Sequence, residues 1–316
     1  MKNIIYNLSN EEYHNGEGYR DYISSTSLKH YLVSPRYYLF MRDNPQPPSA
    51  AQLLGTLFHD LMATLAIANG DWNKGYGEWK AGLAMFDPPV NTRTGKPYGA
   101  DTKTYAEIYQ AFLEANAGKV VVDTAVADIA SDMAHSLLFD CGATSSQVLK
   151  LLKWGTPEVS VFHETEDGIK IKIRPDLLTP KKIVDWKSTN LTSLTEEAIN
   201  RVILKYGYHI SAAQYQWEMH EVTGRWYDFI LVFMQTCPPF DAVMVDMRNY
   251  GYQYVESLET VVLGPGAIQF EELLKLHTRC RQANEYPGAE TFIPGDRYRI
   301  MEIEPPRYYA NRFMED

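Results

Sequence analysis

Residues 156–189 read TPEVSVFHETEDGIKIKIRPDLLTPKKIVDWKST, and this stretch decides the fold. Residues 158–163 (EVSVFH) and 169–175 (IKIKIRP) alternate apolar and polar side chains, which is the pattern of a half-buried strand. Between them, Glu166-Asp167-Gly168 has the composition of a hairpin turn. A break at Thr179-Pro180 precedes a third expected strand over residues 182–187 (KIVDWK). On the second strand the alternation predicts an apolar inner face and a basic outer face.

Three carboxylates and one lysine are expected to meet at one edge of this sheet. Asp176 ends the second strand, and Asp185 follows 185 − 176 = 9 residues later on the third. Lys187 shares a face with Asp185 because strand side chains alternate, and Glu158 can reach the same edge from the first strand. Carboxylate oxygens are the ligands that Mg²⁺ or Mn²⁺ prefers, and a metal-activated water can attack a phosphodiester. An amphipathic hairpin with solvated charges is the alternative, which an isolated D-x-K pattern would favour.

The residues around these acids resemble a known nuclease signature. Arg174-Pro175-Asp176 followed by VDWKST at 184–189 is similar to the PD-(D/E)xK motif, in the branch of RecE (exonuclease VIII) and the phage lambda-type recombination exonucleases. Other similar segments are 24–38 (SSTSLKHYLVSPRYY), 55–59 (GTLFH), 208–210 (YHI) with Tyr215, and 285–288 (EYPG). The resemblance therefore spans residues 23–288, far more than one motif.

The resemblance implies an α/β fold with a restriction-endonuclease-like core, in which helices flank a mixed central β-sheet. We expect one nuclease domain over 1–316: an N-terminal arm (1–22), the core (23–288) with a loop insertion at 70–104, and a C-terminal tail (289–316). Apolar spacing and capping residues predict helices at 50–68, 104–117, 123–138, 194–206, 208–223, 252–262 and 267–283. Strands are predicted at 226–235 and 242–247.

The same resemblance implies the ligand set of a metal site. His59, Asp176 and Asp185 would hold one or two Mg²⁺ (or Mn²⁺) ions, and Glu158 and the Trp186 carbonyl would be further ligands. By its sequence context alone, a lone histidine on an apolar helix is more often a core residue than a ligand. Catalysis would also need Lys187, which would orient the attacking water or stabilise developing charge.

One helix departs from the family pattern. Related nucleases carry Q-x-x-x-Y, whose glutamine supports the metal site or the substrate, whereas this chain has Ser211 at the glutamine position and retains Tyr215. Gln214 lies three residues on, nearly one helical turn, so it either substitutes for the missing glutamine or packs in the core.

The net charge of −10 is unusual for a protein that binds DNA. We therefore expect a local basic channel in an acidic shell, built from residues on and after the second strand: Lys170, Lys172, Arg174, Lys181 and Lys182. Arg36 is a candidate phosphate contact, or else an arginine that covers aromatic surface, and Tyr215 is a further candidate DNA contact. Apolar runs shorter than a membrane span predict no membrane segment, and three widely spaced cysteines predict a reducing cytoplasm.

By resemblance, the protein would degrade one strand of linear double-stranded DNA from 5′ to 3′. The resulting 3′ overhang would serve a single-strand annealing protein in recombination and repair. Family members form rings, which implies a homo-oligomer (a trimer or tetramer) of phage or prophage origin in a bacterial host. Two alternatives remain: an endonuclease or single-strand nuclease on the same core, and a non-catalytic DNA-binding recombination scaffold.

Overall fold

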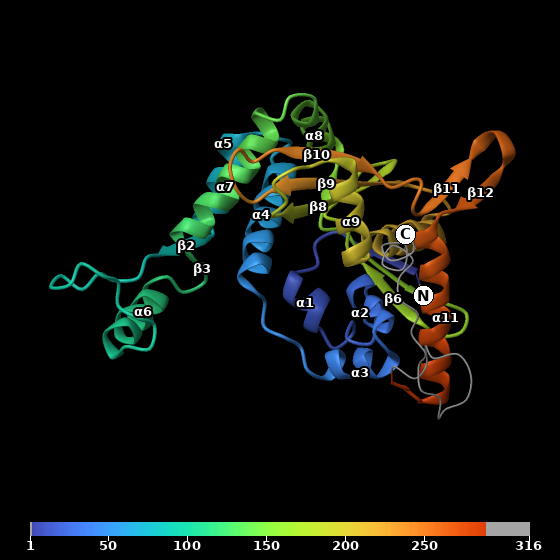
Figure 1. The fold of residues 1–316 in the computed structure, drawn as a ribbon, viewed down its shortest axis with the longest axis horizontal. Coiled ribbons are helices and arrows are strands. Elements are labelled where there is room, and N and C mark those ends of the chain that lie inside the picture. The colour runs from blue at the N-terminus through green and yellow to red at the C-terminus, as the bar shows by residue number, and fades with distance from the viewer. Residues whose placement is uncertain (1, 289–316) are drawn as a thin grey trace, which may run out of the picture.

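The computed structural model describes residues 2–288, and a five-stranded mixed sheet lies at its centre (Figure 1). The strand order is β10-β9-β8-β7-β4. β8 and β9 run parallel, whereas the other neighbours are antiparallel. This arrangement confirms the predicted mixed sheet. The five strands are β4 (Thr156–Pro157), β7 (Leu177–Leu178), β8 (Lys182–Thr189), β9 (Asp228–Gln235) and β10 (Ala242–Asp246).

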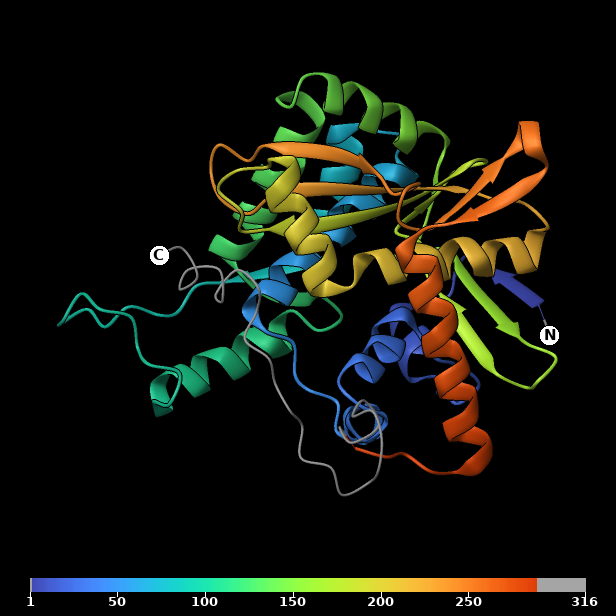
Figure 2. The same cartoon turned by 45° about the vertical axis from the view of Figure 1, so that its right-hand side comes forward.

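Helices cover both faces of this sheet (Figures 1 and 2). On one face lie α4 (Ala50–Ile67), α7 (Thr124–Phe139) and α8 (Ala143–Trp154), and on the other lie α9 (Glu196–Tyr206) and α10 (Tyr208–Thr223). Residues 229–234 of β9 are all apolar because alternate side chains enter two different cores. Ile230, Val232 and Met234 join the α4 side, and Phe229, Leu231 and Phe233 join the α10 side.

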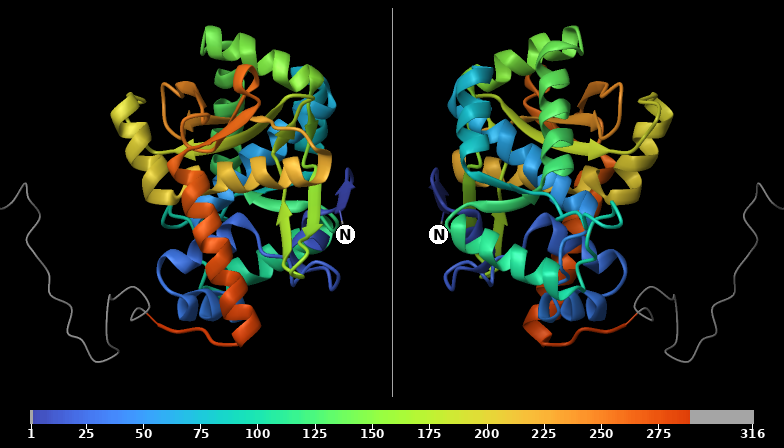
Figure 3. Two further views of the ribbon diagram at one scale, coloured as in Figure 1. Left: turned by 90° about the vertical axis from the view of Figure 1, so that its right-hand side faces the viewer. Right: turned by 90° about the vertical axis from the view of Figure 1, so that its left-hand side faces the viewer.

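A second sheet with the order β1-β5-β6 is formed by β1 (Lys2–Ile5), β5 (Ser160–Glu164) and β6 (Lys170–Ile173). The strand expected over residues 158–163 forms as β5, which begins at Ser160, and its expected start is wrong because Glu158 and Val159 form a break between β4 and β5. Behind this sheet, α10 packs against α11 (Pro265–Ala283) and α2 (Ser25–Lys29) (Figure 3). The N-terminal arm contributes β1 and α1 (Asn10–Asn15), and α3 (Pro35–Asp43) follows α2.

The expected loop insertion at 70–104 is wrong over its first half. Residues Trp72–Ala81 form α5, capped by Asp71, and Leu83–Phe86 form β2. The glycines here suggested a loop, but Gly75 serves helix packing: a Cβ at Gly75 would lie 2.9 Å from the Leu65 Cα of α4. β2 pairs in parallel with β3 (Val120–Asp123), and together with α6 (Lys103–Ala115) it extends away from the central sheet (Figures 1 and 2).

The helix expected at 252–262 is also wrong. This segment forms a hairpin of β11 (Tyr252–Val255) and β12 (Thr260–Leu263), joined at Glu259 in the left-handed region with a φ of 47°. Its valines, tyrosines and threonine favour a strand over a helix. The remaining predicted helices are present within a few residues of their expected ends.

Helix α4 has the length and mean hydropathy of a membrane span, contrary to the expectation from apolar run lengths. It packs instead as a core helix against α5, α7 and the central sheet. Leu61 and Leu65 are fully buried in that core. The predicted C-terminal tail, residues 289–316, lies outside the described residues.

Candidate active site

The candidate site forms where the pairing of the two-residue strand β7 with β8 stops. β7 pairs with β8 through Leu178↔Ile183 and Leu177↔Val184, which places Asp176 opposite Asp185 just beyond the paired residues. Past this point β8 has no strand partner on that side within residues 2–288, so its backbone is available. The Trp186 N–H donates to Asp176 Oδ2 at 2.7 Å, which fixes the carboxylate against the strand. The nine-residue separation of the acids thus becomes a cross-strand neighbourhood.

Helix α4 brings His59 to the same place. Its Nδ1 lies 3.3 Å from Asp176 Oδ1, and the two side chains are 26% and 12% exposed, so solvent reaches the pair. Gly55 permits this approach, because a Cβ there would come within 3.2 Å of Ser188 Oγ on β8. Burial raises the pKa of Asp176 on its own, but the facing His59 and Lys187 hold that pKa below its ordinary value. Asp176 is therefore ionised at neutral pH.

Asp185 and Lys187 form a close ion pair on β8, with 2.6 Å between Oδ2 and Nζ. Lys187 Nζ also donates to the Trp186 carbonyl at 3.3 Å. Burial and the neighbouring Asp176 raise the pKa of Asp185 to about 6 despite the lysine. Burial opposes the charge on Lys187, but the two carboxylates hold its pKa above the ordinary range. Lys187 is thus a permanent cation beside two acids.

Glu158 stands where the first strand breaks between the two sheets. Its φ of 54° lies in the left-handed region, which is uncommon for a residue with a Cβ, and its N–H donates to the Asp176 carbonyl at 3.3 Å. Its carboxylate forms an ion pair with the Arg174 guanidinium, with 2.7 Å between Oε2 and Nε. Burial and the nearby Asp176 charge raise the pKa of Glu158 to about 7. The predicted third carboxylate therefore does join the cluster.

The donor set suits a hard divalent cation. Within residues 2–288, no three His, Cys, Asp or Glu side chains stand in a ready metal-ligand arrangement, since each acid is engaged with a neighbouring base. The chemistry nevertheless fits: Asp176 and Asp185 face each other closely enough that one disfavours ionisation of the other. An imidazole nitrogen, a backbone carbonyl and these oxygens are ligands that Mg²⁺ or Mn²⁺ accepts, and a cation would offset the repulsion.

The predicted basic channel on β6 is wrong. Lys172 is 5% exposed, and its ammonium donates to the Tyr13 carbonyl at 2.7 Å and the Tyr19 carbonyl at 3.0 Å. The N-terminal segment thus covers the expected outer face. Arg174 is likewise held by Glu158 and by the Leu8 carbonyl at 2.7 Å, so neither cation is available to DNA.

The other candidate DNA contacts do not gather around the acids. Tyr215 lies behind the site, where its hydroxyl donates to the Arg174 carbonyl at 3.4 Å, and burial holds its pKa well above the ordinary value. Lys170 lies over the Tyr22 ring, 5.7 Å from its centroid. Lys182, at the far end of β8, pairs with Asp228 at 3.3 Å. The remaining two candidates, Arg36 on α3 and Lys181, are exposed, and their predicted roles stay predictions.

The structure explains the departure at Ser211 through a residue that the sequence did not single out. Lys29, from α2, donates to Ser211 Oγ at 3.1 Å and lies near Lys187, which together with burial lowers the pKa of Lys29 to about 8. Gln214 is fully buried, and its amide has no hydrogen-bond partner among the described residues. Gln214 thus lies in the interior, and Lys29 takes the place beside Lys187. Residues 24–38 belong to the family resemblance, but nothing in that segment singled out this lysine.

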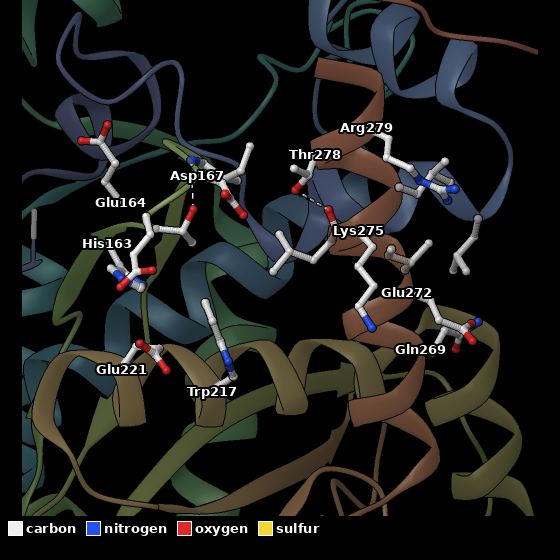
Figure 4. Close-up of a pocket in the computed structure, with 17 residues that line it drawn as sticks. His163, Glu164, Asp167, Trp217, Glu221, Gln269, Glu272, Lys275, Thr278 and Arg279 are labelled. Atoms are coloured by element: carbon white, nitrogen blue, oxygen red, sulfur yellow. Dashed lines mark hydrogen bonds between the residues drawn. The ribbon is translucent and has the colours of Figure 1, made fainter. Parts of the chain in front are cut away.

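A cavity of about 1360 Å³ lies apart from this cluster (Figure 4). It is lined by the β5–β6 turn, α10 and α11, and its charged lining is mainly acidic: Glu164, Glu166, Asp167, Glu221 and Glu272, against Lys275 and Arg279. A negatively charged wall repels a phosphate backbone. None of the predicted site residues lines the cavity, so the candidate active site is the β8 edge.

Comparisons with known proteins agree with this fold. Residues 24–290 match the family described as "PDDEXK-like domain of unknown function (DUF3799)", and the chain belongs to that family. A crystal structure from Eubacterium rectale, described as a "putative exonuclease", superimposes with a TM-score of 0.52 at 14% identity, over 98% of this chain and 99% of that one. No curated protein matches significantly. The predicted PD-(D/E)xK class, with its α/β core, is thereby confirmed, and the chain carries a nuclease-type domain.

Proposed function

We propose that this protein is a metal-dependent exodeoxyribonuclease that degrades one strand of linear double-stranded DNA from 5′ to 3′. The observation that carries the proposal is the convergence of His59, Asp176, Asp185 and Lys187 at the unpaired edge of β8. The related crystal structure described as a "putative exonuclease" supports action on strand ends. The 3′ overhang would pass to a single-strand annealing protein, and a homo-oligomeric ring in a bacterial cytoplasm would keep the enzyme on its substrate.

The metal would be held by His59, Asp176, Asp185, Glu158 and the Trp186 carbonyl. A bound Mg²⁺ or Mn²⁺ would supply Lewis-acid activation of the phosphodiester and of the attacking water. Asp176 is prepared for this role because it is ionised and the Trp186 N–H holds one of its oxygens in place. Glu158 would have to exchange Arg174 for the metal, which its half-exposed side chain permits.

Lys187 acts as a cation and not as a base. Because two carboxylates hold its pKa above the ordinary range, it stays protonated at neutral pH and can only donate. Its ammonium orients the attacking water and stabilises the negative charge that develops on the phosphate. The Trp186 carbonyl and Asp185 limit its movement, so little reorganisation is needed during the reaction.

The test is digestion of linear duplex DNA labelled at the 5′ or the 3′ end, with Mg²⁺ or EDTA, by wild type and Lys187→Ala. Early, metal-dependent release of the 5′ label, absent in the variant, is the expected result. Closed circular duplex DNA should remain intact. Lys182→Ala, on the same strand but at its far end, is the matched control and should keep wild-type activity.

Each other outcome points to a different function. Cleavage of circles would move the assignment to an endonuclease, and preference for single strands would indicate a single-strand nuclease. Early loss of the 3′ label would reverse the polarity. Pure protein that cleaves nothing with Mg²⁺ or Mn²⁺ would refute the nuclease and favour a recombination scaffold.

A further inference from the structure

We propose that the α9–α10 junction, residues 205–208, is a nucleotide-binding subsite beside the catalytic acids. The ring of Tyr206 would stack with one nucleobase of the substrate strand, and the ammonium groups of Lys29 and Lys205 would face its phosphate. This inference rests on the proposed nuclease function and adds a substrate contact to it.

The two rings connect the catalytic cluster to the surface. Lys187 Nζ lies 5.3 Å from the centroid of the Tyr208 ring, so this ring borders the site directly. Tyr208 stacks on Tyr206 with centroids 5.7 Å apart and planes 27° apart. Tyr208 is half-buried, whereas Tyr206 is 50% exposed at the end of α9. An exposed aromatic ring that extends a stacked pair presents a face on which a further flat ring can stack.

Lys29 is fixed at the base of this pair. Its Nζ donates to the Tyr206 carbonyl at 3.2 Å and to Ser211 Oγ at 3.1 Å, and it lies 5.7 Å from the Tyr208 centroid. Gly207 makes room for it: a Cβ there would come within 2.7 Å of Lys29 Cδ, and the φ of 64° is left-handed. The junction is thus shaped around this lysine, which has no carboxylate partner among residues 2–288.

Lys205 lies over the exposed ring of Tyr206. Its Nζ lies 5.1 Å from the Tyr206 centroid, and the side chain is exposed. A solvated cation–π contact of this kind is weaker than the stack of a nucleobase on tyrosine. A base can therefore take this face while the flexible ammonium turns toward the phosphate of the same nucleotide. Tyrosine for the base and lysines for the phosphate are together the elements of single-strand recognition.

The test measures stacking without cleavage. A short single-stranded oligodeoxynucleotide carrying one 2-aminopurine is titrated with full-length protein in EDTA, and again with Ca²⁺, and its fluorescence and Kd are recorded. Wild type should quench the fluorescence through stacking. Tyr206→Ala should abolish the quench and raise Kd about tenfold, whereas Tyr206→Phe, which keeps the ring, should stay within about twofold. Tyr254 on β11 is also exposed, and Tyr254→Ala is therefore the control for general surface effects.

The lysine part has its own readout. Lys205→Ala should keep the quench but reduce the slope of log Kd against log salt by about 0.7, the value for one phosphate contact on a single strand. An unchanged slope would overturn the phosphate role. Wild-type quench and Kd in Tyr206→Ala, or an equal loss in Tyr254→Ala, would overturn the stacking role. Because binding is read in EDTA, failure of the nuclease proposal would show separately, as absent cleavage by a wild type that still binds.

Discussion

Strands β6 and β8 both carry lysines between apolar residues, but their polar side chains have different surroundings. β6 (KIKI) alternates strictly, whereas β8 (KIVDWKST) places Ile183 and Val184 side by side. On β6, the N-terminal arm encloses Lys172, whose ammonium donates hydrogen bonds to two backbone carbonyls of that arm. On β8, Asp185 and Lys187 form an ion pair at an edge that no strand in the described part of the chain pairs.

Alternating apolar and polar residues therefore predict a half-buried strand, but they do not predict which segment covers its polar face. Tyr13, which accepts from Lys172, lies 159 residues away in sequence. Nothing local distinguishes a lysine that faces solvent from one that a distant segment covers. β7, in contrast, is too short to pair along β8, and its shortness leaves Asp185 and Lys187 at an open edge within residues 2–288. The contrast is between a strand with a structural role and one with a proposed catalytic role.

The largest expected effect is on β8. Asp185→Asn keeps the side-chain volume but removes a carboxylate charge from the proposed metal site, so under the proposed function metal-dependent cleavage should fall about 10³-fold. Mg²⁺ or Mn²⁺ should raise the thermal unfolding midpoint of wild type, because the proposed site is assembled only in the native state, and this rise should vanish in the variant. Asp228→Asn, an exposed acid at the start of β9, should change neither quantity. Cleavage within tenfold of wild type would remove Asp185 from the site.

The next effect is on β6 and concerns stability. Lys172→Met keeps the aliphatic stem but leaves the Tyr13 and Tyr19 carbonyls without their donor, which should lower the free energy of unfolding by about 1–3 kcal/mol in urea titrations. Cleavage per folded molecule should stay within about twofold of wild type. A variant of unchanged stability that binds DNA more weakly would return Lys172 to the DNA channel.

A smaller effect is expected in how the unfolding free energies of wild type and Lys172→Met depend on pH. Burial lowers the pKa of Lys172 to about 8 in the folded chain, below its unfolded value of about 10.4. Between these values the unfolded state binds more protons, so the stability contributed at this position rises with pH. The unfolding free energy of wild type minus that of Lys172→Met should therefore increase by on the order of 2 kcal/mol from pH 7 to pH 10. A flat or falling difference would mean that the ammonium is not desolvated.

Much of the core could be predicted because its determinants are local. The apolar spacing of α4 and α10 predicted both helices. The nine-residue separation of Asp176 and Asp185 predicted that the two acids meet. The loop predicted over residues 70–104 was wrong where glycine serves another purpose. Gly75 permits the close packing of α5 against α4. Lys29 escaped notice because its partner Ser211 lies 182 residues away, a proximity that only the folded chain creates.

The smallest expected effect separates the two ends of β8 itself. Lys182 shares the strand with Lys187 but lies at its other end, 39% exposed and paired with Asp228, so Lys182→Ala should change stability by less than about 0.5 kcal/mol. If this end also avoids DNA, the salt dependence of duplex binding, measured by fluorescence anisotropy, should match wild type. A slope reduced by about 0.9 would instead mean that Lys182 neutralises one phosphate. That result would extend the DNA path along the whole strand and restore this part of the predicted basic channel, while β6 stayed covered.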